Sequence, residues 1–170
     1  MLEIIRKDFK NNKGNYKALL VIALYRSASY FHRCKKTFMP LWLIGVPYLI
    51  FYRIFVEWLL CVEIPWDCVI GPGLIIDHGQ GLVINKHAVI GSNCRLRNAV
   101  TIGCKISSDG KQLPSPRIGD NVDIGAAALI IGDIKIGNNV SIGAGSVVLK
   151  DVQDNSVVVG NPGRVIRTKS

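Results

Sequence analysis

The strongest structural signal in this chain is a branched aliphatic residue that recurs every six positions through its second part. The recurrence keeps strict register over residues 118–148, and shorter arrays occupy residues 64–76 and 84–102. An amphipathic helix repeats its apolar residues at intervals of three and four, so a period of six does not fit one. The period instead predicts short strands separated by bends, with one aliphatic side chain pointing inward in each unit.

Three such units close a triangular coil of 18 residues, and stacked coils then share columns of aliphatic side chains. Glycine is distributed accordingly, because 15 of the 17 glycines follow residue 62, where they can relieve the bends. We therefore predict a mainly β fold, with a parallel β-helix over residues 63–170. We assign residues 1–62 to a separate N-terminal segment, which lies before the six-residue repeat.

The six-residue register slips at residues 77–81 and again over residues 103–117, where Ser, Asp, Gly and Pro are typical of an extended loop. Regular coils bury their own side chains, so we expect the chemistry to lie where the register slips. His78 lies in the first slip, next to Gly79. Histidine has an unperturbed pKa of about 6.5, which suits a general base that activates a hydroxyl group at neutral pH.

The pattern resembles the hexapeptide-repeat acyltransferases, and residues 62–168 are similar to the serine acetyltransferases almost without gaps. The matching segments are Val62–Ile64, Asp77–His78, Ala99–Gly103, Ile124–Ala126 and Ile142–Leu149. The branch that O-acetylates exopolysaccharides, the colanic acid acetyltransferase type, is more similar still. It shares Glu63–Ile64, Val83–Lys86 and Gly137–Val140.

This resemblance implies a left-handed β-helix assembled as a homotrimer, with active sites between neighbouring subunits. It implies acetyl-CoA as the co-substrate and no metal. In the family the histidine that matches His78 is the general base, and an acid fifteen residues earlier orients it. Glu63 occupies that position, where serine acetyltransferases have aspartate. Asp77 either contacts the acceptor or caps the loop, and the backbone N–H at Gly103 is a candidate donor to the oxyanion.

A groove for CoA is expected along a column of small residues. Ala126 and Ala144 are 18 residues apart and therefore stack on successive coils, as do Gly125 and Gly143. The resemblance implies that backbone atoms of this column pair with the pantetheine arm. Cations beyond the last repeats are candidates for contacts with the CoA phosphates. They are Lys150, Arg164 and Arg167.

A departure from the serine acetyltransferases bears on the acceptor. Their long loop carries an Arg-His pair that holds serine, whereas Pro114-Ser115 stands in that place here. A site without this ionic clamp binds a free amino acid poorly. We therefore expect an O-acetyltransferase that acts on a sugar hydroxyl of an exopolysaccharide or capsule precursor. A serine O-acetyltransferase of cysteine biosynthesis is one alternative, and a non-catalytic β-helix scaffold or membrane-associated assembly module is another.

The first 62 residues are basic and apolar, with ten Lys or Arg and three acids, a net charge of +7. Apolar spacing over residues 15–35 predicts a helix. Residues 38–52 carry no charge, but two prolines interrupt them and they are short for a membrane span. This part either packs on the coil or its trimer mates, lies at a membrane surface where anionic lipid attracts it, or spans the membrane.

The five cysteines are odd in number and lack CxxC spacing, which favours a reduced cytoplasmic compartment and argues against a zinc site. We expect a cytoplasmic enzyme, peripheral at the inner face of the plasma membrane if the N-terminal segment binds lipid. Nucleic-acid binding is not expected, because the basic residues are mixed with large apolar ones.

Overall fold

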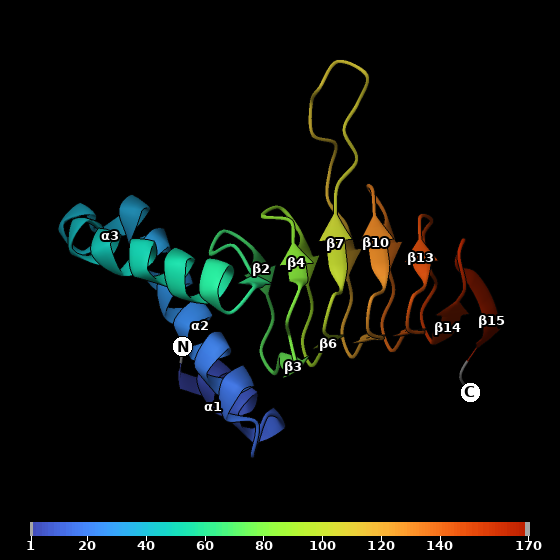
Figure 1. The fold of residues 1–170 in the computed structure, drawn as a ribbon, viewed down its shortest axis with the longest axis horizontal. Helices are drawn as coiled ribbons and strands as arrows, with labels where there is room; N and C mark the ends of the chain where they lie inside the picture. Colours follow the sequence, from blue (N-terminus) through green and yellow to red (C-terminus); the bar gives the residue numbers. More distant parts are fainter. Residues whose placement is uncertain (1, 169–170) are drawn as a thin grey trace.

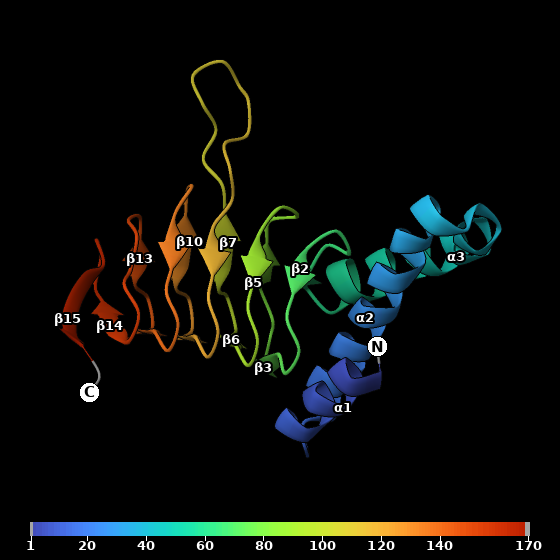
Figure 2. The same ribbon diagram turned by 180° about the vertical axis from the view of Figure 1, so that it is seen from behind.

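The computed structural model describes residues 2–168, and the side chains of all but residues 2, 36 and 37 among them. Helices come first and are followed by a β-helix that ends near the C-terminus (Figures 1 and 2). The helices are α1 (Leu2–Asn11), α2 (Tyr16–Thr37) and α3 (Met39–Tyr52), and the π-helical η1 (Arg53–Leu59) continues α3.

Three sheets form the sides of the β-helix, and within each sheet the consecutive coils pair in parallel. Sheet A holds β1 (Val62–Glu63), β4 (Leu82–Ile84), β7 (Thr101–Gly103), β10 (Leu129–Ile131) and β13 (Val147–Val148). Sheet B holds β2 (Val69–Ile70), β5 (Val89–Ile90), β8 (Arg117–Ile118) and β11 (Lys135–Ile136). Sheet C holds β3 (Ile75–Asp77), β6 (Arg95–Arg97), β9 (Asp123–Ile124), β12 (Ser141–Ile142), β14 (Ser156–Val159) and the antiparallel β15 (Arg164–Thr168).

The aliphatic residues of the six-residue repeat fill the interior, as the sequence predicts. In sheet A, Ile84, Ile102, Ile130 and Val148 are register partners on successive coils, and each is at most 3% exposed. Burial of these branched side chains from all three sheets supplies the main stabilisation of the coils. The two register slips are also confirmed: residues 78–81 form the turn from β3 to β4, and residues 104–116 form a loop that projects from the body after β7 (Figure 1).

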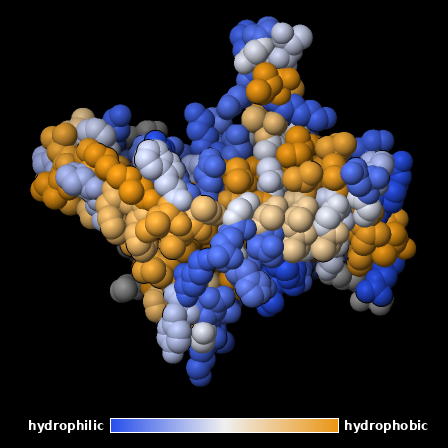
Figure 3. Space-filling view, in the orientation of Figure 1, coloured by the Kyte–Doolittle hydropathy of each residue, from blue (hydrophilic) through white to orange (hydrophobic). Residues whose placement is uncertain are grey.

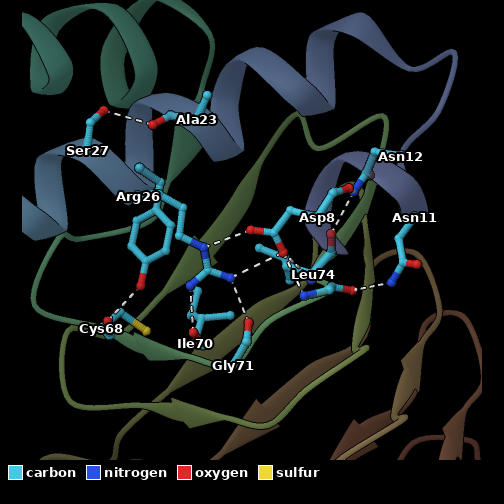
Figure 4. Close-up of polar contacts among 12 residues, drawn as sticks. Asp8, Asn11, Asn12, Ala23, Arg26, Ser27, Cys68, Ile70, Gly71 and Leu74 are labelled. Atoms are coloured by element: carbon cyan, nitrogen blue, oxygen red, sulfur yellow. Dashed lines mark hydrogen bonds and ion pairs between the residues drawn. The ribbon is translucent and has the colours of Figure 1, made fainter. Parts of the chain in front are cut away.

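The helical segment covers the open end of the first coil, where backbone groups of β1, β2 and β3 lack a preceding coil (Figure 4). The carboxylate of Asp8, which is 1% exposed, accepts hydrogen bonds from the N–H groups of Gly73 (2.6 Å) and Leu74 (3.0 Å). It also pairs with the Arg26 guanidinium (Nε–Oδ2, 2.9 Å). The Arg26 guanidinium donates in turn to the carbonyls of Ile70 and Gly71, both at 2.6 Å.

Two buried tyrosines complete this cap. The Tyr25 hydroxyl donates to the carbonyl of Cys68, and the Tyr52 hydroxyl donates to the carbonyl of Ile64, both at 2.7 Å. Burial raises the pKa of both hydroxyls, so they remain protonated donors. Polar side chains from the helices therefore bond to backbone groups beside each of the three first strands, which would otherwise be open to pairing with another chain.

The predicted helix over residues 15–35 is confirmed as α2, and α1 was not predicted. Pro47 lies inside α3 without ending it, and the helix continues through η1 to Leu59. By length and composition the helix over Met39–Leu59, of 21 residues, would suffice to cross a membrane, and only 22% of its most apolar stretch is buried. Figure 3 shows the resulting hydrophobic surface over the helices.

Candidate active site

His78 lies at the corner where the chain passes from sheet C to sheet A, immediately after β3. Its side chain is exposed, and its backbone is in the left-handed region (φ +67°). Gly79 follows with φ +71°, and a β-carbon there would lie 2.8 Å from the Ile76 side chain. The turn therefore requires glycine beside the histidine and holds the imidazole out from the coil.

The same corner continues along the β-helix as a ladder of small residues. The Ala99 N–H donates to the Gln80 carbonyl (2.8 Å) in the turn that carries His78. On the following coils, the Ala127 N–H donates to the Asn98 carbonyl (3.0 Å), and the Gly145 N–H to the Ala126 carbonyl (2.8 Å). With coils about 4.8 Å apart, the Ala126 corner lies roughly 10 Å along this edge from the His78 turn.

The predicted stacking of the small residues is present at this edge. Gly125 and Gly143 follow paired positions of β9 and β12, and a β-carbon at Gly125 would lie 2.7 Å from the carbonyl carbon of Gly143. Within residues 2–168, the N–H groups of Ala126 and Ala144 have no hydrogen-bond partner. The edge thus offers unpaired backbone donors to an extended polar chain lying against it.

Of the three predicted phosphate-binding cations, the structure brings two together. Lys150 and Arg164 line a groove of about 370 Å³ at the last coil, beside Gly163. The Gly163 N–H donates to the Val147 carbonyl (2.7 Å), which fixes this groove next to the edge described above. Arg167 lies farther along β15, opposite Val157, and does not line the groove.

Glu63 lies on the outer face of sheet A, in β1. Its exposed side chain lines a cavity of about 420 Å³ together with Lys86 and Thr101. It makes no hydrogen bond or ion pair with His78 in the part of the single chain that the structure describes. The segments that carry the two residues are hydrogen-bonded to each other, because the Gly81 N–H donates to the Cys61 carbonyl (2.8 Å), two residues before Glu63.

Gly103 ends β7 and lines the same cavity as Glu63. The Thr101 N–H donates to the Ala128 carbonyl (2.9 Å), and the Gly103 carbonyl accepts from the Gly132 N–H (3.0 Å). Alternate residues of a strand face the same neighbour, so the Gly103 N–H also points toward β10. In this arrangement the Gly103 N–H faces the neighbouring strand and is not free to donate to an oxyanion, contrary to the expectation from the sequence.

Asp77 is held in an ion-pair ladder that the sequence analysis missed. Its carboxylate pairs with Arg95 (Nη1–Oδ2, 3.1 Å) and lies 3.9 Å from the Nε of Arg97. Arg97 also pairs with Asp123 on the next coil. The repeat in the sequence could have predicted this ladder. Because β3 and β6 are in register, the two arginines that flank Leu96 fall beside Asp77. These contacts fix the base of the turn that carries His78.

Comparison with known proteins places this chain in a family. Over 161 residues the chain is 38% identical to the putative colanic acid biosynthesis acetyltransferase WcaB of Escherichia coli (strain K12). The match covers 94% of this chain and 96% of that protein. The chain belongs to the hexapeptide-repeat acetyltransferases. The family model "Bacterial transferase hexapeptide (six repeats)" matches residues 115–150 of this acetyltransferase.

Serine acetyltransferases of this family are similar over a shorter part of the chain or share its fold. The enzyme from Synechococcus elongatus is 48% identical over 105 residues, which are 62% of this chain and 42% of that protein. The structure of the Brucella abortus enzyme superposes with a TM-score of 0.80 at 26% identity, over 99% of this acetyltransferase and 69% of that chain. The same enzyme has been solved in complex with coenzyme A (TM-score 0.78, 28% identity). The predicted left-handed parallel β-helix is confirmed by these matches.

Proposed function

We propose that this acetyltransferase moves an acetyl group from acetyl-CoA to a sugar hydroxyl of an exopolysaccharide or capsule precursor in the cytoplasm. The observation that carries the proposal is the similarity to the colanic acid acetyltransferase, which extends over 94% of the chain and includes the helical segment. The similarity to the Synechococcus elongatus serine acetyltransferase covers only 62% of the chain.

The long loop supports a neutral acceptor. Its Pro114-Ser115 pair stands where the serine acetyltransferases have their charged clamp, and Ser115 is buried at the base of the loop. The Ser115 hydroxyl donates to Asn85 Oδ1 (2.9 Å), so this position is a structural anchor. A hydroxyl that anchors the loop offers no cation to an amino-acid carboxylate, whereas a sugar needs none.

His78 is proposed to act as the general base. Its imidazole takes the proton of the acceptor hydroxyl while the oxygen attacks the thioester carbonyl, forming the C–O bond. When the tetrahedral intermediate collapses, the C–S bond breaks and the imidazolium passes the proton to the CoA thiolate. The exposed position of His78 on a corner leaves it accessible to both substrates.

Glu63 is proposed to position His78, since the Gly81–Cys61 hydrogen bond ties the His78 turn to the start of β1. Asp77 is proposed to hold the turn through Arg95 and Arg97, which leaves its carboxylate less available to the acceptor. The edge that carries Ala126 and Ala144 is proposed to hold the pantetheine arm.

The CoA phosphates are proposed to meet Lys150 and Arg164 at the far end of that edge. Gly125 and Gly143 allow the close coil stacking that shapes it. The enzyme is proposed to act as a homotrimer, with each site completed by a neighbouring subunit, as the resemblance to its family implies.

The test follows thiol release from acetyl-CoA by the purified protein with nucleotide sugars, oligosaccharides and free serine as acceptors. The proposal expects release with a sugar and none above background with serine. Release with serine alone would select the serine acetyltransferase instead. His78→Ala should lower the rate by about 10²- to 10⁴-fold with the oligomer intact. His87→Ala, at an exposed histidine on a different corner, should leave the rate unchanged.

A further inference from the structure

An apolar groove of about 390 Å³ lies between the helices and the start of the β-helix, away from the His78 corner. All three tryptophans of the chain, Trp42, Trp58 and Trp66, line it. Aliphatic residues of α3 and η1, among them Leu49 and Ile54, also line it, together with His32 and Arg53. The acetyl-transfer reaction proposed above uses none of these side chains.

Cations stand at the rim of this tryptophan groove. The Cζ of Arg53 lies 4.6 Å from the centroid of the Trp66 ring, and the Nζ of Lys35 lies 5.0 Å from the centroid of the Trp42 ring. An adjoining hollow of about 450 Å³ shares Trp66 and adds Arg33. The nearby acids are Glu57, which bonds to Arg53, and Asp67, which bonds to His32. The three cations outnumber these two acids, so the rim is net positive.

The indole nitrogen of Trp42 is buried and has no hydrogen-bond partner among the described residues. An unpaired buried donor is costly, so its presence beside an open groove points to a polar atom supplied from outside. The surface around the groove is apolar and exposed: Ile44 is 74% exposed, and Trp58 and Leu59 are each 70% exposed. Figure 3 shows this hydrophobic surface over α3.

We propose that the tryptophan groove binds the acyl chain of an anionic phospholipid, and that α3 lies in the surface of a membrane rather than across it. Charge complementarity carries this choice of occupant, because an acyl chain matches the apolar wall and a headgroup phosphate matches the rim of Arg33, Lys35 and Arg53. Tryptophan is also the side chain that favours the interface between lipid and water. The inference stands apart from the acetyl-transfer reaction, whose failure would leave it intact.

Vesicle binding of the full-length protein tests the proposal. The tryptophan emission reports on the groove directly, since it holds every tryptophan of the chain. Vesicles of phosphatidylcholine mixed with phosphatidylglycerol should sediment with the protein, and lipids brominated in the acyl chain should quench its emission. Vesicles of phosphatidylcholine alone should bind more weakly. Equal binding to both, or binding without quenching, would overturn the proposal.

Variants separate lipid binding from misfolding. Lys35→Ala and Arg33→Ala should each weaken partitioning to the anionic vesicles by about fivefold. Ile54→Asp, in the groove wall, should abolish quenching, whereas Ile166→Asp, at an exposed isoleucine on β15, should not. If acrylamide fails to quench the tryptophans of the lipid-free oligomer, a second copy of the chain fills the groove and the proposal is wrong.

Discussion

The cap on the first coil allows a stability prediction that depends only on contacts within the chain. Asp8→Ala removes a carboxylate that is 1% exposed, pairs with Arg26 and accepts from the N–H groups of Gly73 and Leu74. The Arg26 side chain is only 11% exposed. The variant therefore leaves a largely desolvated cation without its anion, and two backbone donors without their acceptor.

The expected cost follows from these contacts. Removing one partner of a buried ion pair costs about 3–5 kcal/mol. Each lost hydrogen bond to a charged acceptor costs about 1.5–3 kcal/mol by itself, but these contributions overlap because one carboxylate serves all the donors. We expect Asp8→Ala to lower the free energy of unfolding by about 3–5 kcal/mol, a large fraction of the stability of a typical domain. Asp8→Asn keeps an acceptor oxygen and should lose less.

Denaturant unfolding followed by circular dichroism measures this loss, at one fixed protomer concentration because association contributes to stability. Arg26→Met and the double variant complete a cycle that isolates the coupling between the two side chains. Asp109→Ala, in the exposed loop pair with Lys111, is the matched control and should change nothing measurable. A loss of no more than about 1 kcal/mol for Asp8→Ala, the range of exposed pairs, would refute the reasoning.

Three further predictions concern other parts of the fold. Gly125→Val should abolish CoA binding in calorimetry, because its side chain would meet the backbone of the next coil at Gly143; wild-type affinity would contradict the stacking. Burial raises the pKa of the Cys94 thiol to about 11, so a thiol reagent at about pH 8 should label exposed Cys61 in the native protein and Cys94 only after unfolding. Burial, with Glu63 nearby, also raises the pKa of Glu57. The protonated Glu57 side chain therefore favours the folded state at low pH, and this contribution to stability is lost as the pH rises through the raised pKa. Glu57→Gln should therefore gain stability relative to wild type as the pH rises from about 4 to about 7, and a constant difference would count against this.

The coils were predictable because a β-helix repeats one physical requirement. Each unit must bury one branched side chain, so Ile84, Ile102 and Ile130 carry the register in the sequence itself. The slips were equally visible, since a turn or loop that leaves the coil adds residues between two members of a column. Counting repeat units along the chain also predicts that His78 and Ala126 lie at the same corner of different coils.

The remaining features depend on contacts that no period encodes. Helix α1 docks through Asp8, whose partner Gly73 lies 65 residues away in the turn before β3, and such a polar contact leaves no repeat in the sequence. The direction of the Gly103 N–H depends on which neighbouring strand accepts it. The geometry between Glu63 and His78 depends on side-chain placement at an exposed corner, so their proposed partnership stays a prediction.

The central claim is that the corner carrying His78 transfers acetyl to a sugar oxygen. The most direct measurement uses acetyl-CoA labelled with ¹³C in the acetyl group and an exopolysaccharide oligosaccharide, with the product identified by nuclear magnetic resonance. The wild-type enzyme should yield a labelled ester on a sugar hydroxyl, and the His78→Ala trimer should yield almost none in the same time. Equal ester formation by both proteins, or label found only on serine or on an amino-sugar nitrogen, would contradict the claim.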